Sequence, residues 1–521
     1  MNLTQLLHRN VLLRPDQDAV CYQNRSLTYR ELAKRVACLA GGLRNIGVKE
    51  GESVPLLSMN SSRYLEYLFA VPWAGAAYNL VNVRWSVSEI AFSLVDSGAR
   101  FLIVDDTFAS MVAEIKEKTP LLAFVIYAGD GECPEGMLSY ELLLTEADPI
   151  EDAYRSGDDL AGIFYTGGTT GTPKGVMLSH TNLMTFALTG AQMSGLSAQP
   201  RWLNCAPLFH IAGLGMLLMS FMLGGTQIIL PAFTPSEVIK TIRKQDVTDM
   251  LLVPTMIQML LDYPDFDVDD FVSMQHILYG ASPMPQGTMN KALKQLPDVG
   301  FIQGYGMTEC GLISISAASN HTAEGNKSGR IRSAGLPGPV QQVRIVDELG
   351  VPVPSGTVGE ITLRGPNIML GYWGKPELTQ KAVVDGWLYT GDGGYMDEQG
   401  YIFVVDRVKD MIISGGENIY SAEVETIISQ HPAVAQCAVI GIPSNDWGET
   451  VHAVIVLALG EKNSDSLTTE QLRDFCKEYI ASYKCPKSMA FIDSLPISGA
   501  GKILKNELRK PYWKSREAQV S

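Results

Sequence analysis

The sequence predicts an α/β protein, with a large N-terminal domain of packed α/β subdomains around largely parallel sheets and a small α+β C-terminal domain. Three observations predict this class. Short apolar runs typical of buried strands alternate with segments whose apolar residues recur at helical spacing. The chain has 521 residues, which is too long for a single hydrophobic core. Hydrophobic residues make up 46% and charged residues 19% of the chain, as in folded globular proteins.

The first hundred residues show this alternation most clearly. Thr28 and Ser86 each begin a Ser/Thr-x-x-Glu capping box, so a helix should start at each of them. The first of these helices should end near Gly47. Polar residues then dominate 131–158, which we expect to be an irregular link between subdomains. The expected strands cover 53–58 and 101–104, and the other expected helices cover 63–77 and 86–97.

A nearly uncharged segment, residues 211–230, raises the question of a membrane span. Gly224 and Gly225 divide it, and the part before them is too short to cross a bilayer. The part after them, 226–230, has the composition of a strand. A buried helix followed by a buried strand is therefore the predicted structure, and no membrane span is expected.

Charge and cysteine content exclude several classes of function. The net charge of −15 argues against non-specific binding to nucleic acid and leaves no polybasic patch for a membrane surface. The eight cysteines include no CxxC pair, so neither a zinc site nor a disulfide framework is expected. Scattered cysteines suit a reducing compartment, and we expect a cytoplasmic protein.

One stretch, residues 165–180 (YTGGTTGTPKGVMLSH), has the composition of a phosphate-binding loop. It follows an apolar run at 160–164 that is typical of a buried strand. Four threonines and three glycines occupy 166–172, and such a segment can turn successive N–H groups toward an anion. Lys174 adds a positive charge, but the spacing differs from a Walker A loop. By composition alone, a solvated Gly/Thr turn remains an equal alternative.

This stretch resembles the phosphate loop of the adenylate-forming superfamily, which includes acyl- and aryl-CoA synthetases, luciferases and the adenylation domains of peptide synthetases. Gly167 stands where serine is common in the family. Further matches follow in the family's order, from about Leu27 to Leu508. The resemblance implies that the loop binds the pyrophosphate end of ATP through Thr166, Gly167, Gly168, Thr169, Thr170, Gly171 and Lys174.

Two later segments resemble the family's adenine and metal sites. The turn at 279–283 would lie against adenine, and 303–309 would hold the base and a metal ion. By this resemblance Tyr305 stacks on the base, while Glu309 and Thr166 bind Mg²⁺. Asp392 would hold the ribose hydroxyls. The other implied ATP- or AMP-binding residues are His210, Gly280, Ala281, Ser282, Gln303, Gly304, Gly306, Thr308, Arg407, Lys409 and Lys502.

The segment 204–210 ends in Pro-Leu-Phe-His, which resembles the family's acyl site. The resemblance implies that Phe209 and His210 gate the carboxylate substrate and that Gly213, Leu214 and Met216 line its pocket. Some of these side chains could equally belong to a plain core helix. Residues 208–222 contain no Asp, Glu, Lys or Arg that could pair with a second carboxylate. We therefore expect a hydrophobic monocarboxylic acid, with a medium or long chain or a ring, rather than a dicarboxylate.

The segment 406–419 resembles the family's hinge, with Lys409 at the hinge position. This divides the chain into a domain at 1–406 that binds ATP and the carboxylate and a mobile domain at 407–521. The resemblance implies that the mobile domain contacts CoA through Gly415, Gly416, Trp447 and Lys484. It also implies that Lys502, which two nearby glycines hold on a loop, is the catalytic lysine.

The expected function is that of an AMP-forming acyl-CoA synthetase, an acid–thiol ligase with Mg²⁺ as cofactor and ATP and CoA as co-substrates. The acid and ATP would give acyl-AMP and pyrophosphate, and CoA would then give acyl-CoA and AMP. Three alternatives stay open: an acyl-AMP ligase that loads a carrier protein, an aryl- or cinnamoyl-type CoA ligase, and a non-catalytic nucleotide-binding protein. The sequence leaves a homodimer open.

Overall fold

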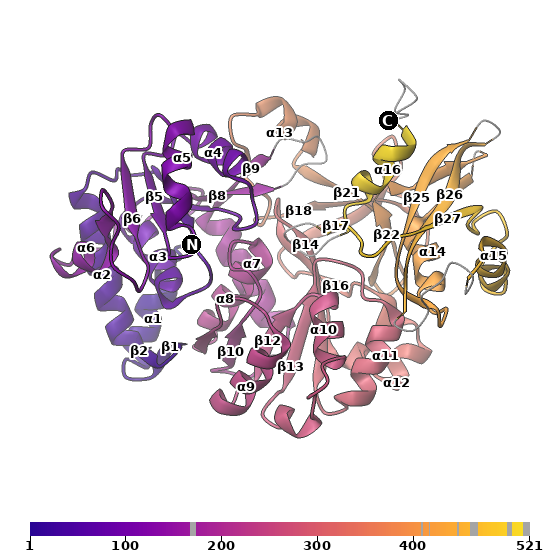
Figure 1. Cartoon of the computed structure of the whole chain (residues 1–521), viewed down its shortest axis with the longest axis horizontal. Coiled ribbons are helices and arrows are strands. Elements are labelled where there is room, and N and C mark those ends of the chain that lie inside the picture. The colour runs from indigo at the N-terminus through magenta and orange to yellow at the C-terminus, as the bar shows by residue number, and fades with distance from the viewer. Residues whose placement is uncertain are drawn as a thin grey trace.

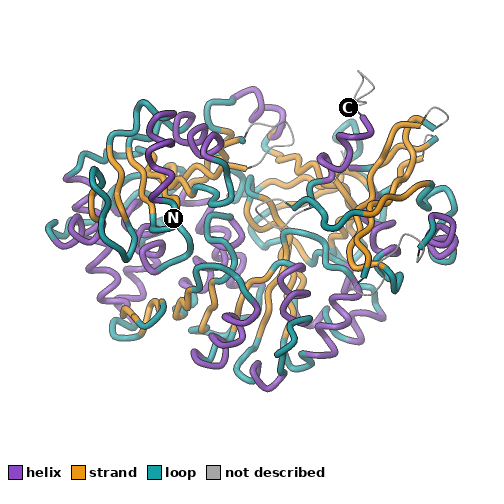
Figure 2. Tube along the Cα trace, viewed as in Figure 1, coloured by secondary structure: helices purple, strands orange, loops and turns teal. Residues whose placement is uncertain are grey.

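A computed structural model of the chain shows the predicted α/β fold class. It describes residues 1–166, 173–407, 410–415, 417–444, 447–458, 467–497 and 503–513, with only the backbone given for Arg407 and Asn418. Figure 1 shows the N-terminal elements at the left, the elements from α7 (His180–Met193) to α12 (Ala323–Lys327) below the centre, and those after β22 (Ile402–Arg407) at the right. Helices cover the strands in each of these groups (Figure 2).

The first group is built on an eight-stranded sheet in the order β19-β9-β8-β4-β3-β5-β6-β7. Helices α2 (Tyr29–Asn45) and α3 (Ser62–Trp73) belong to the core on one face, and α4 (Val87–Asp96) and α5 (Val112–Lys118) to the core on the other. Its pairs are parallel except for β8 with β9 and β9 with β19. The strands are β3 (Ser53–Leu57), β4 (Ala77–Leu80), β5 (Phe101–Val104), β6 (Phe124–Tyr127), β7 (Leu138–Ser139), β8 (Leu160–Thr166), β9 (Lys174–Ser179) and β19 (Gly371–Tyr372).

The second group is built on a nine-stranded sheet in the order β16-β15-β14-β13-β12-β10-β11-β1-β2. The pairs from β14 through to β1 are parallel, and both ends of the sheet are antiparallel. Helices α9 (Pro235–Gln245), α10 (Pro254–Leu261) and α11 (Gln286–Gln295) cover one face. The strands are β1 (Asp18–Tyr22), β2 (Arg25–Thr28), β10 (Arg201–Asn204), β11 (Thr226–Ile229), β12 (Asp249–Leu252), β13 (His276–Gly280), β14 (Gly300–Met307), β15 (Gly311–Ser316) and β16 (Leu336–Pro337).

Two further five-stranded sheets follow. The third sheet is wholly antiparallel and has the order β17-β18-β21-β20, with β22 beside β21. The fourth has the order β24-β23-β26-β25, with β27 parallel to β26. Their strands are β17 (Gln342–Val346), β18 (Gly359–Arg364), β20 (Val383–Val384), β21 (Trp387–Met396), β23 (Ile412–Ser414), β24 (Glu417–Ile419), β25 (Val434–Ser444), β26 (Gly448–Leu457) and β27 (Ser488–Phe491). The remaining helices are α1 (Gln5–Leu13), α6 (Tyr140–Thr145), α8 (Ile211–Met222), α13 (Pro376–Ala382), α14 (Ser421–Ile428), α15 (Thr469–Lys477) and α16 (Lys505–Trp513).

Most of the early elements agree with the sequence prediction, and two differ. Both capping boxes are present, at Thr28 and at Ser86. The helix expected at 63–77 ends at Trp73, because Gly75 adopts a positive φ of 81° and the following residues enter β4. The segment 131–158 is not wholly irregular, since it contains β7 and α6, and α6 packs against α2.

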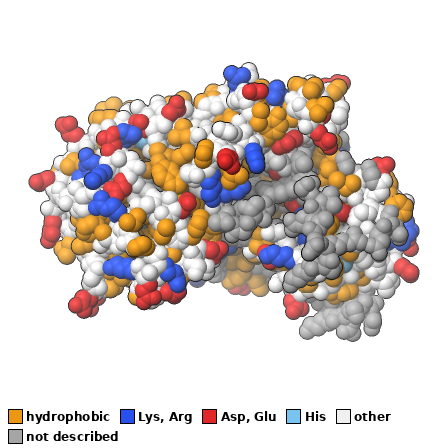
Figure 3. All heavy atoms as spheres, turned by 90° about the horizontal axis from the view of Figure 1, so that it is seen from above, with side chains coloured by type: hydrophobic (Ala, Val, Ile, Leu, Met, Phe, Trp, Pro, Cys, Tyr) orange, Lys and Arg blue, Asp and Glu red, His pale blue; other side chains and the backbone are white. Residues whose placement is uncertain are grey.

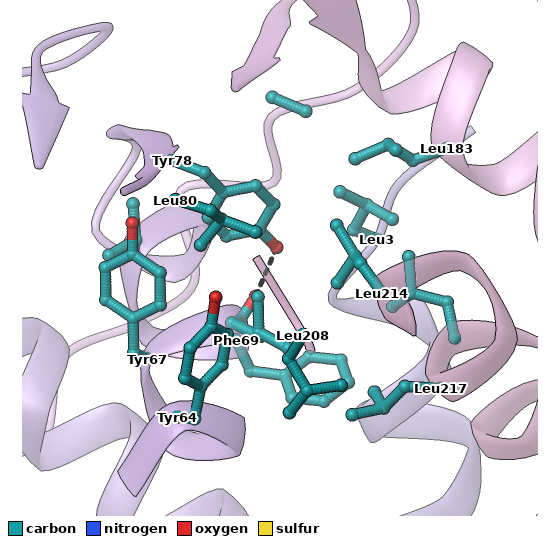
Figure 4. Close-up of a cluster of buried hydrophobic side chains, with 14 of the residues drawn as sticks. Leu3, Tyr64, Tyr67, Phe69, Tyr78, Leu80, Leu183, Leu208, Leu214 and Leu217 are labelled. Carbon is teal, nitrogen blue, oxygen red and sulfur yellow. Dashed lines mark hydrogen bonds between the residues drawn. The ribbon is translucent and has the colours of Figure 1, made fainter. Parts of the chain in front are cut away.

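The largest core lies between the first two sheets, where side chains from distant parts of the sequence meet (Figure 4). Tyr64 and Phe69 come from α3, while Leu214 and Leu217 come from α8. Leu3 packs in the same cluster, which brings the N-terminal segment into this core. The two sheets are thus held together by side chains, and their strand ends are fixed relative to each other.

The apolar segment at 211–230 folds as the predicted buried helix and strand. Helix α8 ends at Met222 and β11 begins at Thr226, with the two glycines between them. Among the described residues, no helix has both the length and the apolar character needed to cross a bilayer. Figure 3 shows one face of the molecule, on which acidic and basic side chains are interspersed rather than separated by sign.

Acid is expected to destabilise the C-terminal sheet through one buried histidine. His452, on β26, is 3% exposed and lies 2.7 Å from the Ser488 hydroxyl and 2.9 Å from that of Tyr512 on α16. Burial lowers the pKa of His452 from 6.5 to about 4. The folded chain therefore keeps His452 neutral while the unfolded chain binds a proton near pH 6.5, so this contribution to stability is present above pH 6.5 and is lost as the pH falls toward 4.

Melting temperatures at pH 7.5 and pH 5 should reveal this effect. The wild-type protein should lose more stability on acidification than His452→Gln, whose amide can still donate and accept hydrogen bonds but does not titrate. An equal loss in both proteins would contradict the role given to this histidine.

Candidate functional site

The predicted phosphate loop connects β8 to β9. These strands form an antiparallel hairpin in which Thr166 pairs with Lys174, so both residues stand at the base of the loop. Residues Gly167, Gly168, Thr169, Thr170 and Gly171 lie outside the described residues. The strand expected at 160–164 is present as part of β8.

Contacts from two different segments hold the two flanks of this loop, and the residues after β19 bind the flank that follows it. The Trp373 N–H donates to the carbonyl of Gly175 at 2.7 Å, and the Lys375 amine donates to the carbonyl of Pro173 at 3.4 Å. On the other side, the Tyr165 hydroxyl donates to the Asp96 carboxylate at 2.7 Å. Asp96 and Lys375 carried no recognisable sequence signal, since each acts through a contact with a residue far along the chain.

The predicted adenine site is formed by the ends of β13 and β14. Gly280 was expected in a turn, but β13 continues through it and pairs Gly280 with Gly304. A Cβ on Gly280 would lie only 2.2 Å from the Gly304 carbonyl oxygen, so the close approach requires glycine. The turn comes one residue later, at Ala281, which has a φ of 66°. The partly exposed predicted residues here are Ala281, Ser282, Gln303, Gly304, Gly306 and Thr308.

Gln303 lies beside a buried pair of side chains, Tyr279 and His321. The Tyr279 hydroxyl lies 3.3 Å from the side-chain oxygen of Gln303, Oε1, and 2.7 Å from His321 Nε2. Burial lowers the pKa of His321 to about 4, so its ring is neutral. Because His321 Nδ1 faces the carbonyl of Ala317 at 3.1 Å and must donate there, Nε2 is the acceptor.

Glu309 lies in the turn between β14 and β15, and it is held by residues from the other sheet. The Tyr372 hydroxyl donates to Glu309 Oε1 at 2.9 Å, and the Lys174 amine lies 5.5 Å from the centre of the Tyr372 ring. Burial, and then the charge of Glu309, raise the pKa of Tyr372, so the phenol stays a proton donor. Contacts thus connect Lys174, at the base of the phosphate loop, through Tyr372 to Glu309, which is the predicted metal ligand. Tyr372 was not among the residues predicted from the sequence.

A second tyrosine joins β14 to the third sheet. The Tyr305 hydroxyl donates to Asp392 Oδ2 at 2.8 Å, and burial followed by the Asp392 charge raises the pKa of Tyr305. Asp392 is 9% exposed and lies inside β21. Its register partner is Arg407 on β22, whose side chain is outside the described part of the chain. The residue predicted to stack on the base, Tyr305, is therefore in contact with the residue predicted to bind the ribose, Asp392.

The predicted acyl-site residues lie at the start of α8. His210 is the residue before the helix, and its ring lies 4.3 Å from that of Phe209. Leu214 is fully buried in the core between the sheets, close to Leu3 and Leu183 in Figure 4, so its immediate surroundings are those of a core side chain. Gly213 packs against the Pro207 carbonyl, where a Cβ would lie 2.4 Å from the oxygen.

Met216 faces the adenine-site strand. It is 4% exposed, and its methyl group lies 4.0 Å from the point where a Cβ on Gly304 would stand. Leu312 lies 3.3 Å from the same point. Phe186, on α7, packs against Gly215 and Gly311, so an aromatic ring fills the space beside these residues. The wall next to Gly304 is therefore apolar.

In the C-terminal part, Gly415 and Trp447 lie together. A Cβ on Gly415 would stand 2.6 Å from Trp447 Cε3, and the Gly415 N–H donates to the Trp447 carbonyl at 2.9 Å. The indole is 51% exposed, and the Lys487 amine lies 4.4 Å from the ring centre. Lys484 instead binds Glu423 through both carboxylate oxygens at 2.8 Å. Lys487 is thus the lysine next to the tryptophan. Lys409, Gly416 and Lys502 lie outside the described residues.

The residues present fit a Mg²⁺ ion that ATP brings with it. Within the described residues no group of three or more His, Cys, Asp or Glu side chains could hold a metal ion by itself. Mg²⁺ in phosphate-transfer sites commonly takes one or two carboxylates, with phosphate and water oxygens completing its shell. Glu309 supplies one carboxylate near the base of the phosphate loop, which suits that arrangement.

Comparisons with known proteins cover most of the chain. The family model described as AMP-binding enzyme matches residues 7–373, and the one described as AMP-binding enzyme C-terminal domain matches residues 423–502. A feruloyl-CoA synthase from Amycolatopsis sp is 41% identical over 509 residues, which span 97% of this chain and 98% of the relative.

Two other proteins extend the comparison. The fatty acid–[acyl-carrier-protein] ligase ScoC of Streptomyces coeruleorubidus is 34% identical over 97% of this chain and 96% of its own length. The crystal structure of ATP-bound MatB from Rhodopseudomonas palustris superposes with a TM-score of 0.88 at 30% identity, covering 98% of this chain and 99% of that one.

Proposed function

The chain belongs to the AMP-binding enzyme family, and from this we propose that it is an ATP-dependent acid–CoA ligase acting on a hydrophobic monocarboxylic acid, with an arylpropenoic acid such as ferulic acid as the first candidate. One observation carries the proposal. Tyr372 and Tyr305 bind Glu309 and Asp392, which gathers the predicted phosphate, metal and ribose residues from three sheets. A plain core would not need two buried phenols aimed at carboxylates.

In the first half-reaction the substrate carboxylate attacks the α-phosphorus of ATP and pyrophosphate leaves. Asp392 holds the ribose, the ends of β13 and β14 hold adenine, and Lys174 lies near the leaving phosphates. Glu309 would hold Mg²⁺, which would neutralise charge on the phosphate oxygens. Tyr372 keeps the Glu309 carboxylate oriented because its phenol stays protonated. The contribution of these residues is positioning and electrostatic stabilisation.

In the second half-reaction the CoA thiol attacks the acyl carbonyl and AMP leaves. We place Trp447 along the arm that carries the thiol, beside Gly415, and Lys487 near the phosphates of CoA. Three observations support this placement. The indole of Trp447 is half-exposed, the Lys487 amine lies over its ring, and any side chain at Gly415 would collide with it. Domains at 1–406 and 407–521 would rotate about Lys409 between the half-reactions, and the two family matches lie on either side of this boundary.

The apolar wall beside Gly304 supports a hydrophobic acid. Met216 and Leu312 line it, and residues 208–222 contain no Asp, Glu, Lys or Arg. The similarity to a feruloyl-CoA synthase favours an aryl acid, and the similarity to a fatty acid ligase keeps a medium- or long-chain acid as the alternative.

A panel of acids tests this proposal. Ferulic, cinnamic, benzoic, octanoic, palmitic and malonic acids would each be supplied with ATP, Mg²⁺ and CoA, and pyrophosphate and AMP release would be followed with and without CoA. We expect continuous AMP formation that requires CoA, with an arylpropenoic acid giving the highest kcat/KM. A single burst of pyrophosphate that CoA does not extend would instead favour the carrier-protein ligase.

Replacing Trp447 with alanine should impair the second half-reaction selectively. Loss of the indole removes a half-exposed stacking surface in the C-terminal domain, whereas no described contact joins it to the nucleotide residues. We expect thiolysis of supplied acyl-AMP to fall by about tenfold or more, as for loss of an aromatic binding contact, while ATP–pyrophosphate exchange changes little.

The matched control is Tyr479→Ala, which removes another half-exposed aromatic side chain from the C-terminal domain. Both half-reactions should remain near wild-type rates in that variant. A loss of exchange in Trp447→Ala, with thiolysis intact, would refute the assignment of Trp447 to the CoA step.

A further inference from the structure

Asp406 makes contacts across the proposed hinge. It lies on β22, before Lys409, yet its carboxylate accepts a hydrogen bond from the Ser421 hydroxyl and another from the Ala422 N–H at 3.2 Å. Ser421 and Ala422 are the first residues of α14, which follows the hinge. A carboxylate at a helix N-terminus is stabilised by the free N–H groups and the helix dipole. The third sheet is therefore bound to the C-terminal domain at this point.

The same hydroxyl is shared with the helix that follows the predicted catalytic loop. The Lys505 amine donates to Ser421 Oγ at 2.6 Å and pairs with Glu425, one turn along α14, at 2.7 Å. The side chains of Lys505 and Glu425 are 13% and 19% exposed, so water screens this pair weakly. Asp406, Ser421 and Lys505 thus form a continuous chain of hydrogen bonds.

A second contact ties the other side of the hinge to α16. Arg509 binds Asp410 through a 2.8 Å ion pair, and it also donates to the Asp410 backbone carbonyl at 3.2 Å. Arg509 stands four residues after Lys505, so the two cations lie on one face of α16. The residues before and after Lys409 are therefore both connected to the helix that begins three residues after Lys502.

A rotation about Lys409 would break some of these hydrogen bonds and ion pairs and leave others intact. The pairs of Lys505 with Glu425 and of Arg509 with Asp410 lie within the moving part and would persist. The bonds from Asp406 join the two parts and would break. A contact made in only one of two arrangements shifts the equilibrium between them by its own free energy.

We propose that Asp406 is a positioning residue that stabilises the arrangement of the C-terminal domain seen here, and that Ser421 links Asp406 to Lys505, at the start of α16. The proposal rests on the proposed function, because it assumes two half-reactions that need different domain arrangements. Asp406 shifts the equilibrium between the two domain arrangements without contacting the substrates.

Asp406→Ala and Ser421→Ala test the proposal when the two half-reactions are measured separately. ATP–pyrophosphate exchange reports adenylation, and thiolysis of supplied acyl-AMP reports the CoA step. Because each variant removes a charge-assisted hydrogen bond made in one arrangement only, the ratio of the two rates should change by about tenfold or more, in the same direction in both variants. A merely structural role would lower both rates equally.

Glu507→Gln is the matched control, since it breaks the Glu507–Lys510 ion pair, which lies on the same helix and is largely exposed. The ratio of exchange rate to thiolysis rate in Glu507→Gln should equal that of the wild-type protein. An unchanged ratio in Asp406→Ala and Ser421→Ala, or an equal loss of both rates, would overturn the proposal. A wild-type protein that shows neither half-reaction would refute the proposed function instead.

A double-mutant cycle tests the role of the shared hydroxyl. Asp406→Ala and Lys505→Gln should each change the ratio of the exchange rate to the thiolysis rate by some factor. The double variant should change this ratio by less than the product of the two single-variant factors, because both residues act through Ser421. A double variant whose change equals that product would overturn the proposed link through Ser421. Circular dichroism melting of every variant confirms that the rates are those of folded protein.

Discussion

Lys502→Ala should abolish acyl-adenylate formation while leaving the thiolysis of supplied acyl-AMP largely intact. The resemblance places the Lys502 amine between the attacking carboxylate and the α-phosphate, where charge builds up during the first half-reaction. A unit charge about 4 Å from another contributes roughly 4 kcal/mol at an effective dielectric near 20, equivalent to a rate factor of about 10³. By the same resemblance, this amine is withdrawn from the reacting atoms before the second half-reaction.

ATP–pyrophosphate exchange and single-turnover thiolysis measure the two steps. Lys510→Ala is the matched control because this side chain is on the following helix, is 60% exposed and pairs with nearby Glu507. Exchange in that variant should stay near the wild-type rate. Equal losses of exchange and thiolysis in Lys502→Ala would contradict the role given to Lys502.

Glu309→Gln should lower ATP–pyrophosphate exchange by about 10²-fold or more, the usual cost of removing a group that stabilises developing charge. The amide keeps the shape of the side chain and can still accept from Tyr372, but it removes the negative charge that would hold Mg²⁺. We therefore expect the Mg²⁺ concentration for half-maximal exchange to rise as well. Titrations with Mg²⁺ at saturating ATP measure both changes.

Tyr372→Phe separates orientation of the carboxylate from its charge. It removes only the 2.9 Å bond to Glu309 and keeps the ring beneath Lys174. Loss of such an outer partner typically costs about 10- to 100-fold in metal affinity or activity, so the variant should lie between wild type and Glu309→Gln. A Mg²⁺ requirement unchanged in Glu309→Gln would exclude Glu309 as the metal ligand.

The sequence predicted the parts of the fold whose causes are local. The capping boxes at Thr28 and Ser86 specify their helix starts through contacts within four residues. The glycines at 224 and 225 separate α8 from β11 in the same way. The antiparallel third sheet was not predicted, because pairing of β17, β18, β21 and β22 depends on contacts between distant segments that leave little trace in composition.

The same distinction applies to the candidate site. Glu309 and Asp392 stand out within recognisable motifs, so their roles could be proposed from the sequence. Tyr372 could not be identified, because its importance lies in a hydrogen bond to a residue 63 positions away. Asp406 begins the segment that resembles the family's hinge, but nothing in the sequence shows its hydrogen bond from Ser421, 15 positions away. Long-range side-chain contacts are what the structure adds.

The register of β21 and β22 has a consequence for protein engineering. Asp392 pairs with Arg407, so the strand that leads into the C-terminal domain is hydrogen-bonded alongside the proposed sugar-binding residue. A foreign C-terminal domain grafted on before β22 would have to rebuild this pairing. A junction after Arg407 would leave this pairing and the host's proposed adenine and ribose residues in place, and chimeras joined there should retain those nucleotide contacts even when the new partner domain fits poorly.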